Sequence, residues 1–160
     1  MQPDHPAAAA PEWTKAAKRK LAGRLKVIKP FDPYNSPLCT CPPKLTLNVY
    51  TGCGTECFYC YTSSYAWGRW GRCSDRWGPR KDVLAGVQHD LDLLAESPLG
   101  MLPVVLSLSS DPYPDTPAVK ESDLCLTRRC LQMITAAGMS IMIQTKSDML
   151  LRDLDLLAHV

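Results

Sequence analysis

Residues 45–60 read LTLNVYTGCGTECFYC, and this stretch decides what kind of fold the chain builds. Its first six residues alternate between apolar side chains at 45, 47 and 49 and other side chains between them. That period of two predicts a β-strand with one face in a core. From Thr51 onward the period disappears, and the glycines predict a loop. The strand therefore leads directly into a loop that holds the thiols of Cys53, Cys57 and Cys60.

Helical and strand patterns alternate through the rest of the chain. The predicted elements are, in order, a helix over 83–94 capped by Asp82 and ended by Ser97 and Pro98, a strand over 104–108, a helix within 118–137 ended by Gly138, a strand over 141–143, and a last helix capped by Ser147 or Asp148. The inward side chains of the second helix are predicted to be those of Leu124, Leu131 and Ile134. This order is typical of an α/β fold with a parallel sheet, in which ligands bind beyond the carboxyl ends of the strands.

Length and composition indicate one folded domain behind a tail. The chain has 160 residues, 46% of them hydrophobic and 21% charged, which excludes wholesale disorder and coiled coil. We predict that residues 1–44 form a basic tail rich in proline and alanine, followed by an extended lead-in to the fold, and that residues 45–160 form the domain. No apolar run is long enough to cross a bilayer and no secretory signal is recognisable, so we expect a cytoplasmic protein with no membrane partner.

Eight cysteines without an export signal favour metal or redox chemistry over a disulfide framework. Three thiolates on a four-iron cluster leave one iron open, and an open coordination position separates a catalytic metal site from a structural one. The alternative is structural zinc, with Cys39 and Cys41 completing the site. Those two residues and Cys73 are also candidates for an additional cluster, whereas Cys125 and Cys130 are predicted to be small core residues.

The spacing Cys-x3-Cys-x2-Cys, with an aromatic residue before the third cysteine and a strand before the loop, resembles the radical S-adenosylmethionine superfamily. Three further stretches are similar to its spore photoproduct lyase-like branch, namely Ser109–Pro114, Leu126–Arg128 and Thr145–Ser147. The resemblance runs from about Cys41 to His159 and implies an iron–sulfur enzyme. Such an enzyme reductively cleaves S-adenosylmethionine to a 5′-deoxyadenosyl radical, which abstracts hydrogen from a substrate.

The resemblance also implies cofactors and partners. Cys53, Cys57 and Cys60 would ligate a [4Fe-4S] cluster, and S-adenosylmethionine would chelate the fourth iron. A one-electron donor such as a flavodoxin or ferredoxin would reduce the cluster, and DNA or another nucleic acid is a candidate partner, while the resemblance leaves the substrate open.

Individual roles carry over by position. Tyr59 would lie by the adenine, and Tyr61, as the catalytic candidate, would lie near the cofactor or in hydrogen-atom relay. Ser110 would hydrogen-bond the methionyl end of the cofactor with Asp111 beside it, and Lys146 would pair with the cofactor carboxylate. All five residues follow predicted strands, where α/β ligands bind.

The resemblance implies that the parallel βα repeats form the first part of a partial TIM-type barrel. Members of the superfamily have about six βα units, so we expect a chain that ends after three and corresponds to the N-terminal part of such an enzyme.

Residues 65–81 interleave arginines and lysine with aromatic rings, a combination that contacts phosphates and stacks on single-stranded nucleic acid. The alternative for this loop is that its tryptophans pack against the fold and its arginines are solvated. Together with zinc-bound cysteines, the loop supports a second candidate function, a zinc-stabilised nucleic-acid-binding module without catalysis.

Overall fold

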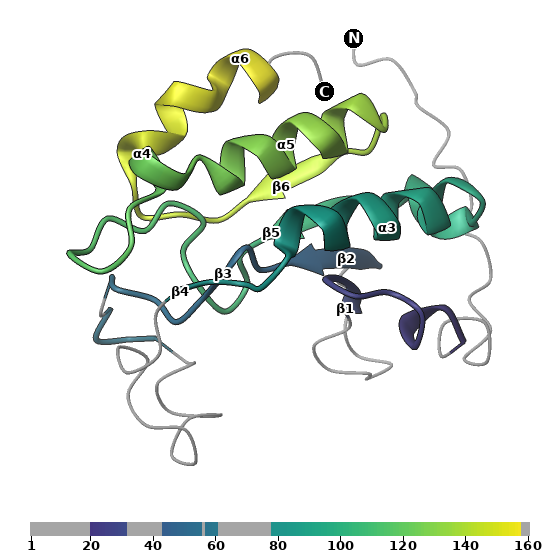
Figure 1. Cartoon of the computed structure of the whole chain (residues 1–160), viewed down its shortest axis with the longest axis horizontal. Coiled ribbons are helices and arrows are strands. Elements are labelled where there is room, and N and C mark those ends of the chain that lie inside the picture. The colour runs from purple at the N-terminus through teal and green to yellow at the C-terminus, as the bar shows by residue number, and fades with distance from the viewer. Residues whose placement is uncertain (1–19, 32–42, 56, 61–77, 158–160) are drawn as a thin grey trace, which may run out of the picture.

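The structure is a computed structural model, and it describes residues 20–31, 43–55, 57–60 and 78–157. These residues form a four-stranded sheet in the order β1-β2-β5-β6 and a separate two-stranded ribbon of β3 and β4 (Figure 1). The strands are β1 (Ile28–Phe31), β2 (Lys44–Leu47), β3 (Tyr50–Thr51), β4 (Gly78–Pro79), β5 (Val104–Leu106) and β6 (Ile141–Ile143). The helical elements are α3 (Val83–Ala95), η2 (Pro98–Met101), α4 (Glu121–Leu124), α5 (Leu126–Ala136), η3 (Asp148–Asp153) and α6 (Leu154–Leu157).

Three strands of the larger sheet are parallel, which confirms the predicted α/β class. β2 pairs with β5 and β5 with β6, so that Leu47, Leu106 and Ile143 stand side by side where the strands end. The edge strand β1 runs antiparallel to β2 and lies within the segment interpreted from the sequence as tail and lead-in. The sequence analysis did not predict β1, because its four residues, IKPF, contain a lysine and a proline that hide the strand pattern. The partial barrel stays a prediction.

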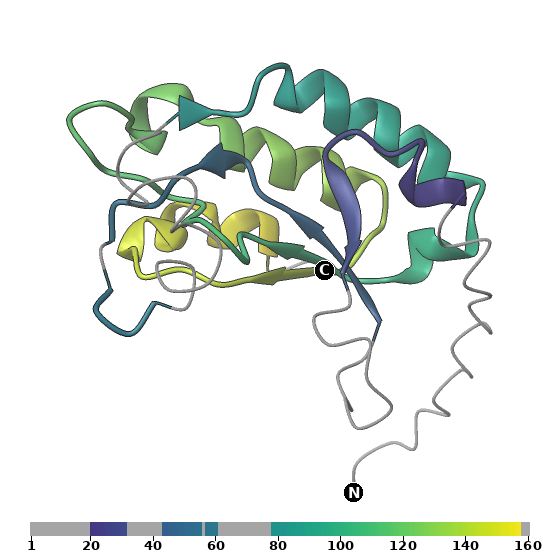
Figure 2. The same cartoon turned by 90° about the horizontal axis from the view of Figure 1, so that it is seen from below.

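Helices α3 and α5 lie next to each other on one face of the sheet (Figures 1 and 2). The apolar residues of α3 recur at helical spacing, and the buried ones are Val83, Val87, Leu91 and Leu94. They pack on the side chains of the strands that face them, including the fully buried Leu45 and Leu47. The core therefore lies between the helices and the sheet and leaves the strand ends available for a site.

The second predicted helix is broken in two. Cys125 has a φ of 51° and separates α4 from α5. Leu124, predicted to face inward, is 40% exposed, whereas Leu131 and Ile134 are fully buried as predicted. Gly138, with a φ of 71°, ends the helical segment in the left-handed conformation that favours glycine.

The predicted caps have different outcomes. Ser147 accepts a hydrogen bond from Met149 N at 3.2 Å and caps η3, as predicted. Asp82 precedes α3 as expected, but its φ is 51° and its side chain makes no capping hydrogen bond. Within the described ranges, no helix is both long and apolar enough to cross a membrane.

Candidate functional site

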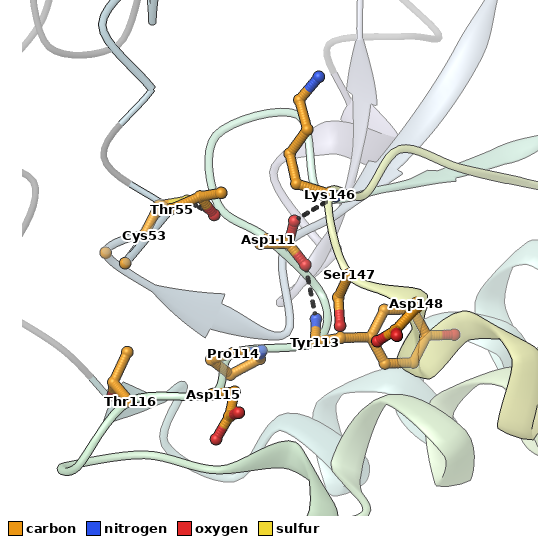
Figure 3. Close-up of a pocket in the computed structure, with 12 residues that line it drawn as sticks. Cys53, Thr55, Asp111, Tyr113, Pro114, Asp115, Thr116, Lys146, Ser147 and Asp148 are labelled. Atoms are coloured by element: carbon orange, nitrogen blue, oxygen red, sulfur yellow. Dashed lines mark hydrogen bonds between the residues drawn. The ribbon is translucent and has the colours of Figure 1, made fainter.

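A cavity of about 560 Å³ lies beyond the carboxyl ends of β5 and β6 and is closed on another side by the loop after β3. Figure 3 shows Cys53 and Thr55 on one side of it and Asp111 and Lys146, from the loops that follow the two strands, on another, with the Asp111 carboxylate turned toward the backbone of Lys146 and Tyr113. Three of the predicted site residues, from three separate segments, therefore line one cavity: Cys53, Asp111 and Lys146.

Asp111 fixes the geometry of this cavity. Asp111 is only 8% exposed, and its carboxylate accepts hydrogen bonds from Thr145 Oγ1 at 2.8 Å, Lys146 N at 2.8 Å and Tyr113 N at 2.9 Å. A buried carboxylate that accepts several N–H and O–H donors holds those donors firmly, because its desolvation must be compensated. Asp111 thus fastens the loop after β6 to the loop after β5.

Lys146 connects this framework to the cysteine loop. Its Nζ lies 5.4 Å from the centroid of the Tyr59 ring, a cation–π distance. Contact with the Tyr59 side chain raises the pKa of Lys146, so the ammonium group stays charged at neutral pH. Tyr59 is 62% exposed and stacks edge-on against the 96% exposed Phe58. The two predicted cofactor contacts Tyr59 and Lys146 are therefore neighbours.

The side chains of Cys53, Cys57 and Cys60 are all half-buried in the loop after β3. Cys60 N donates to Cys57 O at 3.0 Å in a tight turn, and Cys53 Sγ lies 3.3 Å from Thr55 Oγ1. Across the described ranges, no three His, Cys, Asp or Glu side chains are arranged to hold a metal ion. The donor chemistry fits a thiolate-bound metal centre, but the loop does not bring three such ligands to one point.

Ser110 has a buried hydroxyl without a partner. Its Oγ makes no hydrogen bond, and the residue is 8% exposed directly before Asp111. Buried polar groups in folded proteins are nearly always satisfied, so an orphaned hydroxyl beside a cavity is a position that a bound polar group would complete.

Glu121 supports the site and was missed by the sequence analysis. It is fully buried, and its carboxylate accepts the Tyr50 hydroxyl, Thr127 N at 3.1 Å and Arg152 at 3.0 Å. Burial, and then the hydrogen bond to Glu121, raise the pKa of Tyr50, so this phenol stays neutral. Glu121 thereby holds β3, the strand that leads into the cysteine loop, against the start of α5.

The stretch Leu126–Arg128, quoted above for its resemblance, has a structural role. The Thr127 hydroxyl donates to Pro112 O, and Arg128 pairs with Asp153 at 2.8 Å. Burial alone would raise the pKa of Asp153, but Arg152 and then Arg128 outweigh it and lower that pKa. These contacts join α5 to both the Asp111 loop and η3. No periodicity in the sequence signals them, because each partner lies in a different segment.

Another structural contact missed by the sequence analysis is that of Asn48. Its Oδ1 accepts Ser109 N at 3.1 Å and so ties the end of β2 to the loop after β5. A polar residue after a strand is a weak signal, because solvent exposure explains it equally well.

Several predicted residues lie outside the described part of the chain. They are Tyr61, Cys39, Cys41, Cys73 and residues 65–77 of the loop rich in tryptophan and arginine.

Comparison with known proteins adds one relative of undetermined role. An uncharacterized protein of Methanocaldococcus jannaschii is 31% identical over 137 residues, which cover 83% of this chain and 45% of that protein. The chain therefore spans about half the length of the curated relative it matches. No protein-family model and no solved structure matches the chain.

Proposed function

We propose that this chain is an iron–sulfur enzyme, or the N-terminal part of one, that reductively cleaves S-adenosylmethionine and acts on a substrate of the DNA photoproduct class. One observation carries the proposal: Cys53, Asp111 and Lys146, from three segments that resemble the radical S-adenosylmethionine superfamily, line the same cavity. The cavity volume of about 560 Å³ falls within the range of about 300–1,000 Å³ typical of small-ligand sites.

The residues have complementary roles in this proposal. Cys53, Cys57 and Cys60 are the thiolate ligands of a [4Fe-4S] cluster. Such a cluster, when bound and reduced, supplies the electron that breaks the sulfonium bond of S-adenosylmethionine. The Lys146 ammonium pairs with the carboxylate of the cofactor, and the orphaned Ser110 hydroxyl hydrogen-bonds its methionyl end.

Asp111 is a positioning residue here. Its carboxylate is engaged by Thr145, Lys146 N and Tyr113 N, so it orients the backbone that carries Lys146. The Tyr59 ring lies under the ammonium of Lys146, a residue that lines the cavity, and this contact supports a role for the ring beside the cofactor. That arrangement suits a planar adenine.

Cluster binding requires the loop after β3 to close around the metal centre. Gly52, with a φ of 79°, and Gly54 give this loop conformational freedom next to Cys53. Metal binding commonly supplies the free energy that orders such ligand loops. We expect the thiols of the three cysteines to converge on loading, with Thr51 and the β3–β4 pairing unchanged.

Anaerobic reconstitution with iron and sulfide tests the ligand assignment. The wild-type chain should bind about four irons and four sulfides per molecule. Cys57→Ala should lose most of this iron, while Cys125→Ala, a half-buried cysteine outside the loop, should keep it. Iron content unchanged in Cys57→Ala contradicts the ligand assignment, and about one tightly held zinc per chain favours the zinc-stabilised module instead.

Binding of S-adenosylmethionine to the reconstituted chain tests the pocket. Lys146→Ala should weaken binding roughly tenfold through loss of a charge-assisted contact, with the iron content intact. Lys20→Ala, which removes an exposed lysine remote in sequence, is the matched control. Equal affinity of wild type and Lys146→Ala removes Lys146 from the site.

A further inference from the structure

A second cavity, of about 740 Å³, lies at the start of α3 and has a basic lining. Three cationic side chains line it, those of Lys26, Arg80 and Lys81, together with one acidic residue, Asp82. None of the three cations has an ion-pair partner among the described residues. The lining therefore carries a net charge of about +2 that nothing in the described fold neutralises.

The Lys26 side of this cavity is firmly built. The fully buried Asp90 carboxylate of α3 accepts the backbone N–H groups of Lys26 at 2.7 Å, Val27 at 2.7 Å and Ile28 at 2.8 Å. Gly86 allows this close approach, because a Cβ there would lie 2.8 Å from Val27 Cγ1. Figure 2 shows the segment with β1 running beside α3. Lys26 is thereby held against the first turns of that helix.

The Arg80 side is held by the β3–β4 ribbon. Tyr50 pairs with Pro79 and Thr51 with Gly78, and Arg80 N donates to Val49 O at 3.0 Å. The Nε atom of Arg80 is buried yet has no hydrogen-bond acceptor. A buried guanidinium N–H without an acceptor is costly and rare, and an anion entering the cavity would supply the missing acceptor.

The lining suits a phosphate group. Arginine and lysine together at one site are typical of phosphate contacts, and α3 begins there with no acidic residue in its first turn. A net charge of about +2 matches two successive phosphodiesters or one phosphomonoester. A carboxylate ligand would leave at least one of these positive charges unbalanced.

The cavity also adjoins the candidate site. Thr51 lines the basic cavity, while the next two residues, Gly52 and Cys53, line the cavity that contains Asp111 and Lys146. The short strand β3 therefore stands between the two. Arg80 and Lys81 are also the described end of the loop rich in tryptophan and arginine.

We propose that the cavity formed by Lys26, Arg80 and Lys81 binds the phosphate backbone of a nucleic-acid strand and holds that strand across β3 from the candidate site. The choice of a nucleic acid rests on the proposed function, and the phosphate rests on the cavity itself. The test below needs neither cluster nor S-adenosylmethionine, so its failure and the failure of the proposed function are distinguishable.

The experiment measures fluorescence anisotropy of a labelled oligothymidylate of about 12 nucleotides titrated with the full metal-free chain at several salt concentrations. Arg80→Gln should weaken binding roughly tenfold at low salt and reduce the slope of log K against log salt by about 0.7, the value for one phosphate contact on a single strand. Lys26→Ala, an exposed side chain whose backbone contacts to Asp90 remain, should act in the same direction with an unchanged circular dichroism spectrum. Arg129→Gln, an exposed arginine on α5 in a different groove, is the matched control and should change binding less than twofold.

Three outcomes overturn the inference. The first is that Arg80→Gln and Lys26→Ala both bind the strand with an affinity within twofold of that of the wild type. Another is Arg129→Gln weakening binding as much as Arg80→Gln does, which would indicate general surface charge. The third is thermal stabilisation by inorganic phosphate, abolished in Arg80→Gln, without any strand binding, since that would assign the cavity to a small phosphorylated compound.

Discussion

Replacing Glu121 with alanine should destabilise the fold more than any exposed substitution, because Glu121 is fully buried and its carboxylate has partners in three segments, β3, α5 and η3. The change removes the acceptor for the Tyr50 hydroxyl, which is itself in a residue only 2% exposed, and for Thr127 N and Arg128 N at the start of α5. It also removes one partner of Arg152, which keeps its contacts to Asp153. A buried donor left without its acceptor costs about 1–3 kcal/mol, and Tyr50 and Thr127 N are two such donors, so we expect the free energy of unfolding to fall by about 2–6 kcal/mol.

Urea denaturation followed by circular dichroism at neutral pH measures this loss through the midpoint and slope of the transition. Glu121→Gln keeps the shape and one acceptor oxygen, so its loss should be smaller than that of Glu121→Ala. Glu96→Ala makes the same chemical change at an exposed position after α3 and should stay within about 0.5 kcal/mol of wild type.

The reasoning fails if Glu121→Ala lies within about 1 kcal/mol of wild type while its denaturation slope is unchanged. That result would mean that water or side-chain rearrangement satisfies Tyr50 and the start of α5 without the carboxylate. A complete loss of folding in Glu121→Ala leaves the test to Glu121→Gln, which must then be destabilised relative to Glu96→Ala.

Three other perturbations have defined outcomes. Burial raises the pKa of the Cys130 thiol from its usual 9.0 to about 12. Above pH 9 the unfolded chain loses this proton and the folded chain keeps it, so the free energy of unfolding should fall between pH 9 and 12, by at most about 1.4 kcal/mol per pH unit. Below pH 9 this group should have no effect. Cys130→Ala should therefore show a shallower alkaline decline than wild type, and parallel curves would refute the role of the thiol. Asp111→Ala should lower the free energy of unfolding by about 2 kcal/mol. It should also speed amide hydrogen exchange at Lys146 and Tyr113, measured by mass spectrometry, because both amides donate to the carboxylate that is removed. Unchanged protection of both amides would contradict the role of Asp111 in joining the two loops. Thr127→Val leaves Pro112 O without its donor and should lower the stability measured in a thermal melt by about 1–3 kcal/mol. Thr135→Val changes a partly exposed helix position and should be nearly neutral. Equal effects of the two variants would contradict a structural role for the Thr127–Pro112 hydrogen bond.

The order of the main elements could be read from local patterns. The alternation from Leu45 predicted one strand over residues 45–50, of which 45–47 lie in β2 and Tyr50 lies in the separate strand β3. The helical spacing of Val83 and Val87 predicted α3, and residues 141–143 form β6 as predicted. These predictions are confirmed because each element buries one face, and burial of one face imposes a period on the sequence.

The departures have long-range causes. Strand β1 is held by pairing to β2 and by Asp90, a carboxylate far along the chain, so its own residues carry little strand signal. The break at Cys125 follows from the position of Glu121, whose N–H donates to Pro114 O at 2.9 Å and whose carboxylate holds the start of α5. A local pattern cannot reveal such contacts.

The sequence by itself determined the α/β class and the three cysteines, and it predicted that Ser110, Asp111 and Lys146 follow strands. Only the tertiary structure decided that Cys53, Asp111 and Lys146 share a cavity, that Asp111 positions Lys146 through its backbone, and that Lys26 and Arg80 meet beside β3. The physical reason is that periodicity records which face of an element is buried, whereas the partners of a buried charge are chosen by whichever segments the sheet brings together.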